Sequence, residues 1–294
     1  MWGDYLVVDV LGAGGMGSVY LAVQQPIGLR AALKLIGAGV PATLAGVVAR
    51  FEAEAVALAR LTHPNIVRLL KYGVQHQQPY LVMEYVEGGR TLEAALRGEP
   101  ADRPPAAHVL RQTVNALVSA HERGVIHRDI KPENIMLVEV EGDPHFVKLV
   151  DFGLAKFTDD GHETRLRGGS PWYMAPEQVA GGAVGPWTDF YAVTTLTYRL
   201  LYGRRMWGRL SSDDVWTMKR DPRHVPAELS GLGAAPEATR AFFHRGLAYD
   251  PAHRYADAAT FRAALEAACE AAAAVGLDGI TTVFRRPGAA AQPD

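Results

Sequence analysis

The sequence has almost no cysteine, no long hydrophobic run and almost no net charge. Its only cysteine is Cys269, so no disulfide can form within the chain and a reducing compartment is expected. No window approaches the run of about 20 apolar residues that a membrane helix needs. The closest stretch, residues 263–275, is interrupted by Glu266 and Glu270. The formal net charge of −2 gives no general attraction to nucleic acid or to anionic lipid.

The first residues also lack a feature, because no basic segment followed by an apolar one is present in Met1–Asp4 or after it. This absence argues against a signal peptide. We therefore expect a cytoplasmic protein without a membrane span and without a nucleic-acid partner. The 294 residues are enough for two packed lobes, and 48% hydrophobic with 21% charged residues is ordinary for a globular protein.

One short stretch concentrates reactive side chains. His127–Asn134 contains a carboxylate (Asp129), an ammonium group (Lys131) and a carboxamide (Asn134), and a second carboxylate follows at Asp151. Asp129 and Lys131 lie two residues apart, so they can face the same reacting group. His127 lies in an apolar context, which favours a packed core histidine over an acid or base. We expect Val125–Ile126 to enter the stretch as a short buried strand.

A predicted hairpin brings the two ends of this region together. The apolar runs Ile135–Val140 and Phe146–Val150 flank Gly142–Asp143, which is typical of a turn. Folding the hairpin places Asn134 close to Asp151, because both flank the same strand pair. An amide oxygen and a carboxylate form an oxygen-rich site suited to Mg²⁺ held between protein and phosphates.

Glycines near the start of the chain indicate a second phosphate contact. Gly12, Gly14 and Gly17 allow a backbone turn to approach phosphate oxygens, because no Cβ stands in the way. The same pattern opens dinucleotide-binding units, in which a helix follows. Here Val19–Val23 continues as a strand, which favours a hairpin lying over a nucleotide.

A lysine and a glutamate interrupt apolar segments that follow the glycines. Lys34 lies in the apolar strand Ala31–Ile36, and a strand lysine with its ammonium group in solvent is the alternative interpretation. Glu54 shares a helical face with Phe51, Leu58 and Leu61, whereas Glu52 points away to solvent. A carboxylate in that stripe needs a cation, which predicts the pair Lys34–Glu54.

Together these motifs resemble the signature set of protein kinases. The chain resembles a eukaryotic-like (Hanks-type) bacterial Ser/Thr protein kinase over about residues 5–275. The resemblance implies an α+β, bilobal protein kinase fold. We expect a small, mostly antiparallel β N-lobe with one main helix at 1–84, a hinge at 85–89 and a larger, mostly helical C-lobe at 90–275. The tail at 276–294 is short in core-forming residues and is expected to be disordered.

The resemblance also implies the catalytic roles. Asp129 is the base that orients the substrate hydroxyl, and Lys131 neutralises the transferring phosphoryl group. Lys34, paired with Glu54, contacts the α- and β-phosphates, while Asn134 and Asp151 hold the metal. The implied cofactors are ATP and Mg²⁺, with Mn²⁺ as an alternative, and the implied partners are protein substrates. Lysine at position 131 resembles Ser/Thr rather than tyrosine kinases.

The adenine and phosphate contacts are carried over in the same way. Met83 corresponds to the gatekeeper, backbone groups of Glu84 and Val86 meet the adenine, and Val19, Ala32 and Met136 enclose it. The full expected nucleotide-binding set is Leu11, Gly12, Ala13, Gly14, Gly15, Met16, Gly17, Ser18, Val19, Ala32, Lys34, Met83, Glu84, Val86 and Met136.

Residues Asp151–Glu177 match the activation segment of the family. Arg128, beside the expected base, needs an anion, and a phosphate on this segment would supply one. Thr164 resembles the phosphothreonine of bacterial relatives, although Arg165 and Arg167 beside it depart from the usual pattern. Ser170 resembles the hydroxyl residue that contacts the catalytic aspartate and lysine. We expect autophosphorylation at Thr164 to order the segment, and we assign Thr158 no role.

The rest of the chain is expected to be scaffold. Glu177 and Arg254 match a glutamate and an arginine that pair with each other in the family. Asp189 opens an apolar helix, Phe190–Tyr202, and could be its cap. In the family the corresponding residue also holds the backbone of the catalytic loop, and Asp189 can have both roles. Thr194 departs from the glycine common in relatives. Further helices are predicted at Val109–His121, ended by Gly124, and at Asp257–Val275.

Two alternatives to an active protein kinase stay open. A pseudokinase would bind nucleotide without turnover, but such proteins usually lack the lysine, the base or the metal aspartate, and Lys34, Asp129 and Asp151 are all present. A small-molecule phosphotransferase shares the catalytic Asp and the metal Asn. It would not be expected to carry the segment Ala175–Glu177 with a matching Arg254.

Overall fold

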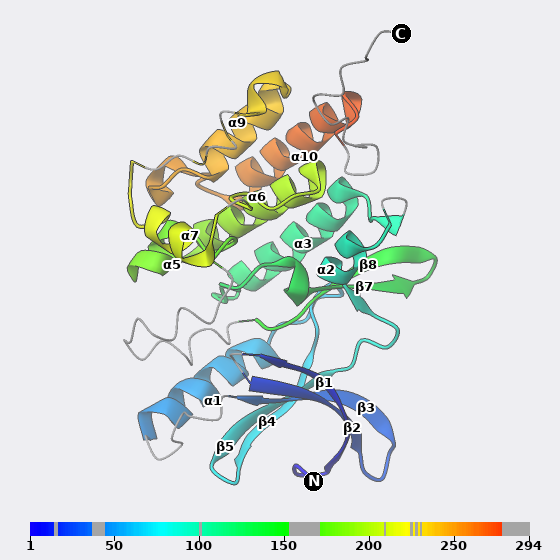
Figure 1. Cartoon of the computed structure of the whole chain (residues 1–294). Helices are drawn as coiled ribbons and strands as arrows, with labels where there is room; N and C mark the ends of the chain where they lie inside the picture. Colours follow the sequence, from blue (N-terminus) through cyan, green and yellow to red (C-terminus); the bar gives the residue numbers. More distant parts are fainter. Residues whose placement is uncertain are drawn as a thin grey trace, which may run out of the picture.

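The computed structural model describes residues 1–14, 17–36, 45–99, 102–152, 171–208, 210–223, 226, 229 and 231–277. Within these ranges the side chains of residues 14, 45–48, 50 and 231 are not described. The chain forms a β-rich part followed by a larger helical part, with a small sheet between them (Figure 1).

The β-rich part is a five-stranded antiparallel sheet in the order β1-β2-β3-β5-β4. Helix α1 packs against β4 and β5 (Figure 1). A cluster of buried side chains from Tyr5, Leu33, Tyr80 and Val82 lies within this sheet. The elements are β1 (Tyr5–Gly14), β2 (Gly17–Gln24), β3 (Leu29–Ile36), α1 (Ala45–Ala59), β4 (Leu69–Gln75) and β5 (Gln78–Glu84).

Local sequence explains where several of the helices begin and end. Thr91 caps α2 by accepting the Ala94 N–H at 3.1 Å, and Asp257 caps α10 by accepting the Thr260 N–H at 2.8 Å. Gly203 ends α6 in the left-handed conformation, at φ 66°. The helices are α2 (Leu92–Arg97), α3 (Ala106–His121), α5 (Pro176–Ala180), α6 (Pro186–Tyr202), α7 (Ser212–Met218), α9 (Glu237–Gly246) and α10 (Ala258–Ala274).

A small sheet of β6 (Arg90–Thr91), β7 (Ile135–Val140) and β8 (Asp143–Leu149) lies between the two parts. The β7–β8 turn is made by Glu141 and Gly142, both at positive φ (50° and 84°), which is typical of a two-residue hairpin loop. The prediction placed the turn one residue too late, at Gly142–Asp143, because glutamate gives no turn signal.

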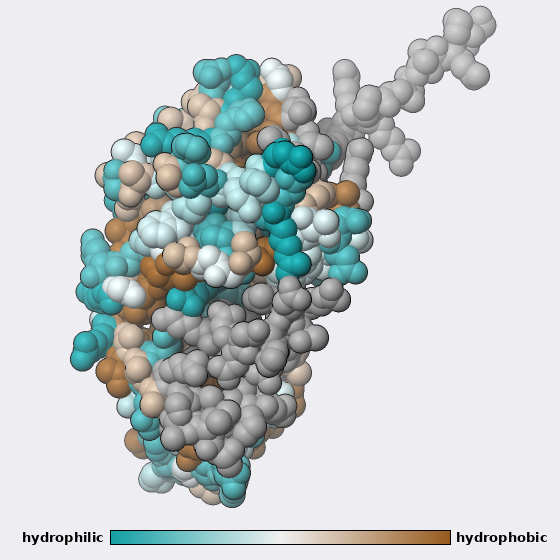
Figure 2. Space-filling view, turned by 90° about the vertical axis from the view of Figure 1, so that its left-hand side faces the viewer, coloured by the Kyte–Doolittle hydropathy of each residue, from teal (hydrophilic) through white to brown (hydrophobic). Residues whose placement is uncertain are grey.

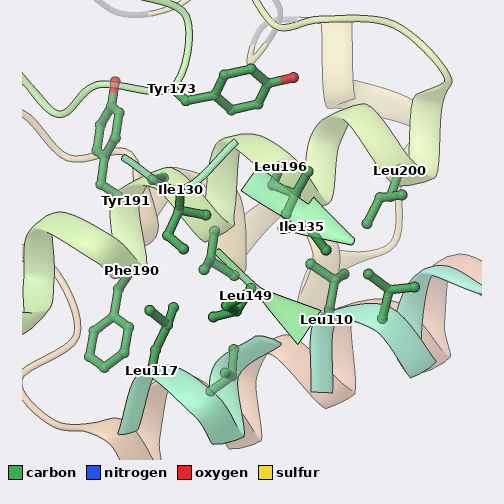
Figure 3. Close-up of a cluster of buried hydrophobic side chains, with 14 of the residues drawn as sticks. Leu110, Leu117, Ile130, Ile135, Leu149, Tyr173, Phe190, Tyr191, Leu196 and Leu200 are labelled. Carbon is green, nitrogen blue, oxygen red and sulfur yellow. The ribbon is translucent and has the colours of Figure 1, made fainter. Parts of the chain in front are cut away.

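The main core joins the hairpin to the helices. Ile130, Ile135 and Leu149 lie between α3 and α6, packed against Leu117 and Leu196 (Figure 3). The same cluster continues into α1 and β5, so the two parts of the chain share one continuous core. Hydrophilic residues cover much of the helical half on the face shown in Figure 2, with apolar residues between them.

None of the helices described here has the length and apolar character needed to cross a bilayer.

The expected α+β bilobal kinase fold is confirmed, with β5 ending at Glu84 and β6 beginning at Arg90 on either side of the expected hinge. Two local expectations are wrong. Residues 125–126 form no strand, since the Val125 N–H donates back to the Ala120 carbonyl of α3 at 3.0 Å and not to a neighbouring strand. Helix α6 starts at Pro186, before the expected Phe190, because proline at the first turn lacks only an N–H that has no helical partner there.

Helices α6 and α9 approach closely at Thr194. A Cβ atom at Gly246 would lie 2.4 Å from the Thr194 Oγ1 and 2.8 Å from its Cγ2. Thr194 is fully buried, and its hydroxyl donates to the Phe190 carbonyl at 2.8 Å. Thr194, the departure noted in the sequence, is therefore accommodated by a glycine on the facing helix.

We expect Gly246→Ala to destabilise the protein by about 1–3 kcal/mol, because it overpacks this contact. The variant Thr194→Ala/Gly246→Ala should recover part of that loss. Urea unfolding measures both, with Gly233→Ala as the control, since no atom lies within 4 Å of a Cβ there. Equal stability of Gly246→Ala and wild type would contradict the close approach.

Candidate active site

Two side chains of the expected catalytic stretch converge on the carboxylate of a third, Asp129. The Asp129 Oδ2 accepts a hydrogen bond from the Lys131 Nζ at 2.7 Å and from the Asn134 Nδ2 at 2.9 Å. The Asn134 amide also donates to the Asp129 carbonyl at 2.8 Å. The side chains of Asp129 and Lys131 are 11% and 17% exposed, so both remain accessible to solvent. The spacing in the sequence therefore does place these groups around one point.

Asp189 orients this loop from below. Its buried carboxylate accepts the backbone N–H groups of His127 at 2.9 Å and Arg128 at 2.8 Å, and it contacts the His121 Nε2 at 2.7 Å. Arg128 adopts the left-handed conformation, at φ 68°. Of the two predicted roles for Asp189, the structure shows the contact with the loop. The cap interpretation is wrong, since Asp189 lies in the first turn of α6 and Gly185 is the N-cap. No local pattern in the sequence indicated the contact between His121 and Asp189.

The β7–β8 hairpin brings the second carboxylate to the same region. Ile135 pairs with Leu149, and the Val150 N–H donates to the Asn134 carbonyl at 3.1 Å. Asp151 follows at φ 63°. Its Oδ2 lies 2.8 Å from the Lys34 Nζ of β3, which is only 3% exposed. Lys34, from the first sheet, is thus in contact with Asp151, the expected metal ligand that follows the last strand of the second sheet.

Helix α1 presents Glu54 on its buried face. Glu54 is 9% exposed, with Phe51 and Leu58 buried on the same face and Glu52 exposed, as the helical pattern predicts. The observed partner of Lys34 is Asp151, and the pair Lys34–Glu54 stays a prediction.

The donor set fits a magnesium ion that is shared with phosphates. Among the residues described, no group of three or more His, Cys, Asp or Glu side chains could hold a metal by itself. Asn134 and Asp151 supply an amide oxygen and a carboxylate, and the amide nitrogen of Asn134 is already directed at Asp129. Mg²⁺ commonly binds through one or two carboxylates, with the remaining positions filled by phosphate oxygens and water.

The residues expected to bind nucleotide come from both sheets. The β1–β2 hairpin carries Leu11–Gly14 and Gly17–Val19, whereas Gly15 and Met16 lie outside the described residues. Ala32 pairs with Met83 across β3 and β5. Below the hinge, a Cβ at Gly89 would meet Val86 Cγ1 at 2.7 Å and Met136 Cε at 2.9 Å, so these two side chains close against the glycine. Their contacts with adenine stay predictions.

An apolar cavity that the sequence did not indicate lies beside Met83. Its walls come from α1, β4, β5 and the end of β8, and they include Leu58, Leu81, Leu149 and Phe152. Asp151 contributes to the same lining. The cavity therefore extends from the sheet to the expected metal ligand.

His127 has a packing role. It is fully buried, its Nε2 lies 3.0 Å from the Val150 carbonyl, and the Asp129 N–H approaches its Nδ1 at 3.3 Å. Burial holds the pKa of His127 below its ordinary value, which favours the neutral ring. Its ring centroid lies 4.3 Å from that of Phe152. These contacts support the interpretation as a core histidine.

Further contacts fasten the first sheet to the hairpin. The Asn65 amide donates to the Gln112 Oε1 and to the Val147 carbonyl, both at 2.8 Å. The Lys148 Nζ lies 2.7 Å from the Glu84 Oε1. Lys148 lies near the end of β8, shortly before Asp151, and Glu84 is the last residue of β5. Sequence analysis missed all these links, since each joins residues with no shared local pattern.

The predicted pair Glu177–Arg254 is formed and buried. Two arginine nitrogens, Nη1 and Nη2, each lie 2.9 Å from a carboxylate oxygen of Glu177, and the Thr188 hydroxyl donates to Glu177 at 2.8 Å. The arginine and glutamate side chains are 1% and 7% exposed. The pair therefore fixes the position of Glu177, the last residue of the expected activation segment.

Gln178 connects that segment to the catalytic loop. Its Oε1 accepts the Ala175 N–H at 3.0 Å, and its Nε2 donates to the Arg128 carbonyl at 2.7 Å. Sequence analysis gave Gln178 no role. Its bonding partners are backbone groups, which leave no signal in the sequence.

The activation-segment predictions cannot be placed. Thr158, Thr164 and Ser170, together with Arg165 and Arg167, lie outside the described residues.

Comparisons with known proteins agree with this geometry. A family model described as protein kinase domain matches residues 5–266. The serine/threonine-protein kinase Pkn1 of Myxococcus xanthus is 39% identical over 271 residues, which cover 90% of this chain and 38% of Pkn1. PrkC of Bacillus subtilis is 32% identical, with 92% of this chain and 41% of PrkC covered. The chain thus spans less than half the length of these curated relatives.

A solved structure is also similar. The PknI kinase domain of Mycobacterium tuberculosis, in a cysteine-to-alanine mutant, superposes with a TM-score of 0.68 at 28% sequence identity. The match covers 92% of this chain and 97% of the PknI chain.

We expect Glu177→Gln to cost about 3–5 kcal/mol in the free energy of unfolding, because it leaves the buried Arg254 without its counter-charge. Arg254→Met should cost a similar amount, and the double variant should cost less than the sum of the two. Urea unfolding measures all three. Glu237→Gln is the control, since the Glu237–Arg240 pair is exposed and should contribute at most about 1 kcal/mol. Additive effects of the two single changes would contradict the coupling.

Proposed function

The chain belongs to the protein kinase domain family, and from this premise we propose that it transfers the γ-phosphoryl group of ATP to serine and threonine hydroxyls of proteins. The observation that carries the proposal is the convergence of Asp129, Lys131 and Asn134, with Asp151 brought alongside by the hairpin and Lys34 by β3. ATP with Mg²⁺ supplies the activated phosphoryl group and the charge that draws electrons toward the leaving phosphate.

Asp129 is proposed as the residue that binds and orients the attacking hydroxyl. Its Oδ2 accepts hydrogen bonds from both Lys131 and Asn134, which fix the position of the carboxylate and leave Oδ1 to accept from a substrate. A substrate hydroxyl donating to it would be held in line with the phosphoryl group. Lys131, 2.7 Å away, is placed to stabilise negative charge on that group.

Asn134 and Asp151 would hold the metal, and Lys34 would bind phosphate oxygens. The 2.8 Å contact between Lys34 and Asp151 supports a common centre for these groups, because an ammonium group there can exchange a carboxylate for a phosphate. Glu54, buried on α1, is proposed to orient Lys34 when it does so. This chemistry asks chiefly for positioning and charge neutralisation, and the residues present are sufficient for both.

The nucleotide would lie between the glycine-rich hairpin and β7. We propose that the backbone of Glu84 and Val86 binds the adenine next to Met83, with Val19, Ala32 and Met136 on its two faces. The division into an N-lobe at 1–84, a hinge at 85–89 and a C-lobe at 90–275 follows from this placement. Dependence on ATP also favours a cytoplasmic location.

The alternatives make different predictions. A nucleotide-binding scaffold would need no competent base, yet Lys131 and Asn134 both donate hydrogen bonds to Asp129. A small-molecule phosphotransferase would not need the buried pair Glu177–Arg254 that fixes a segment beside the loop. Both features favour phosphorylation of proteins.

Incubation with labelled ATP and Mg²⁺, followed by phosphosite mapping, should give label on Ser or Thr with the wild type. Asp129→Asn should lower the rate by a factor of about 10²–10⁴, because the hydroxyl loses its orienting acceptor. Glu139→Gln, an exposed carboxylate on β7, is the matched control and should retain activity. Equal labelling by Asp129→Asn and wild type would refute the role of Asp129. Tight nucleotide binding without any labelling would favour the scaffold.

Autophosphorylation at Thr164 is the second part of the proposal. The Arg128 side chain next to the base supports it, since a phosphate would be a strong anion for the guanidinium group. We expect Thr164→Ala to lower the rate on an external substrate, with Thr158→Ala as the control that keeps it. Phosphosite mapping and a rate assay measure both. Unchanged activity of Thr164→Ala would remove this idea.

A further inference from the structure

A lysine, Lys219, is buried beneath residues 171–175, the end of the expected activation segment. Lys219 follows the last turn of α7, and its backbone N–H donates to the Val215 carbonyl at 3.0 Å. The residue is only 4% exposed. Within the described ranges, no carboxylate oxygen lies within 4.0 Å of its Nζ. Such a charge is costly to bury, so its location requires an explanation.

Aromatic rings and backbone carbonyls surround this ammonium group. The Nζ lies 4.3 Å from the ring centroid of Trp207 and 5.0 Å from that of Tyr191. It donates to the Trp172 carbonyl at 3.2 Å and to the Met174 carbonyl. A lysine has three N–H donors, so two carbonyls and a ring face can use all of them.

The charges around Lys219 make this arrangement specific. The Arg254 guanidinium lies 4.7 Å from the centroid of the same Tyr191 ring. Its charge is balanced by the carboxylate of Glu177. Burial, followed by the charge of Arg254, holds the pKa of Lys219 well below its ordinary value, whereas Glu177 acts in the opposite direction. Lys219 therefore contributes its hydrogen bonds to carbonyls rather than an ion pair.

The two carbonyls belong to a segment that is fastened to the catalytic loop at its other end. The Ala175 N–H donates to Gln178, and Gln178 donates to the carbonyl of Arg128, the neighbour of Asp129. Between these anchors the side chains of Trp172 and Met174 are half-buried, so part of each faces outward. Lys219 thus supports, from below, a surface next to the residue proposed to bind the substrate hydroxyl.

We propose that Lys219 is a positioning residue for the protein substrate: by holding the carbonyls of Trp172 and Met174, it sets the surface on which the peptide around the acceptor hydroxyl is bound. The inference rests on the proposed kinase activity and goes beyond it. The ligand is a polypeptide segment, and the surface offered to it is the exposed part of the Met174 thioether and of the Trp172 indole, over whose ring the Arg205 guanidinium lies at 5.3 Å. An apolar residue of the same length at position 219 would fill the space beside the Trp207 and Tyr191 rings but leave both carbonyls without these donors.

The test is a comparison of steady-state constants for wild type and Lys219→Met on one Ser/Thr peptide. We expect the KM for the peptide to rise at least about tenfold, with kcat and the KM for ATP changed less than about twofold. Lys219→Arg, which keeps the charge and the donors, should bring the peptide KM back toward the wild-type value. Arg223→Met removes an exposed cation a few residues away and should leave all three constants unchanged.

Urea unfolding of each variant separates positioning from folding. If Lys219→Met does not unfold cooperatively, Lys219→Leu is measured by the same criterion, since it also removes every N–H donor from the side chain. A folded variant with a wild-type peptide KM would overturn the proposal, and so would a failure of both variants to fold. A parallel loss of kcat and ATP binding would do the same. An inactive wild type would instead refute the proposed function.

Discussion

The conformation of the catalytic loop depends on the buried carboxylate of Asp189. Residues 125–131 belong to no helix or strand, so their backbone N–H groups have no ladder to bind. Asp189, at the start of α6, accepts two of them, from His127 and Arg128, and thereby stabilises Arg128 in a left-handed conformation that is unfavourable for arginine. The turn at Arg128 directs the next side chain, Asp129, toward Lys131. A carboxylate in the helical core thus determines the direction of one at the surface.

The other half of the site depends on β8, because this strand is bound from both sides. Leu149 exchanges backbone hydrogen bonds with the segment after α1, donating to the Asn65 carbonyl at 2.8 Å and accepting from the Val67 N–H at 3.0 Å. The strand therefore packs in the core of the helices and is also joined, by an isolated bridge at Ile66, to the segment that leads into β4. Asp151, two residues later, is held where Lys34 of that sheet can reach it. Binding of a nucleotide between the two parts would add contacts to a connection that already exists.

Much of this could be predicted from the sequence, and the part that could not has a physical reason. Glu54 was found because a charge interrupts an apolar helical face, and Asp129 because Lys131 and Asn134 follow at fixed short distances. Both signals are local. Gln178 and Lys219 instead bind carbonyl groups of distant backbone, which every residue carries and no sequence pattern marks. The chain direction that creates such contacts is known only once the fold is known.

The buried charges of the helical part share one property. Asp189, Arg254 and Lys219 each bind backbone groups of segments outside helices and strands, in addition to any counter-charge. Apolar residues of similar size would avoid the cost of desolvation and could leave the protein equally stable or more so. They could not, however, bind an N–H or carbonyl group at one defined point. The desolvation cost at these positions is therefore matched by a constraint on the irregular segments that these side chains bind. A reaction that relies on orientation needs that constraint more than it needs stability.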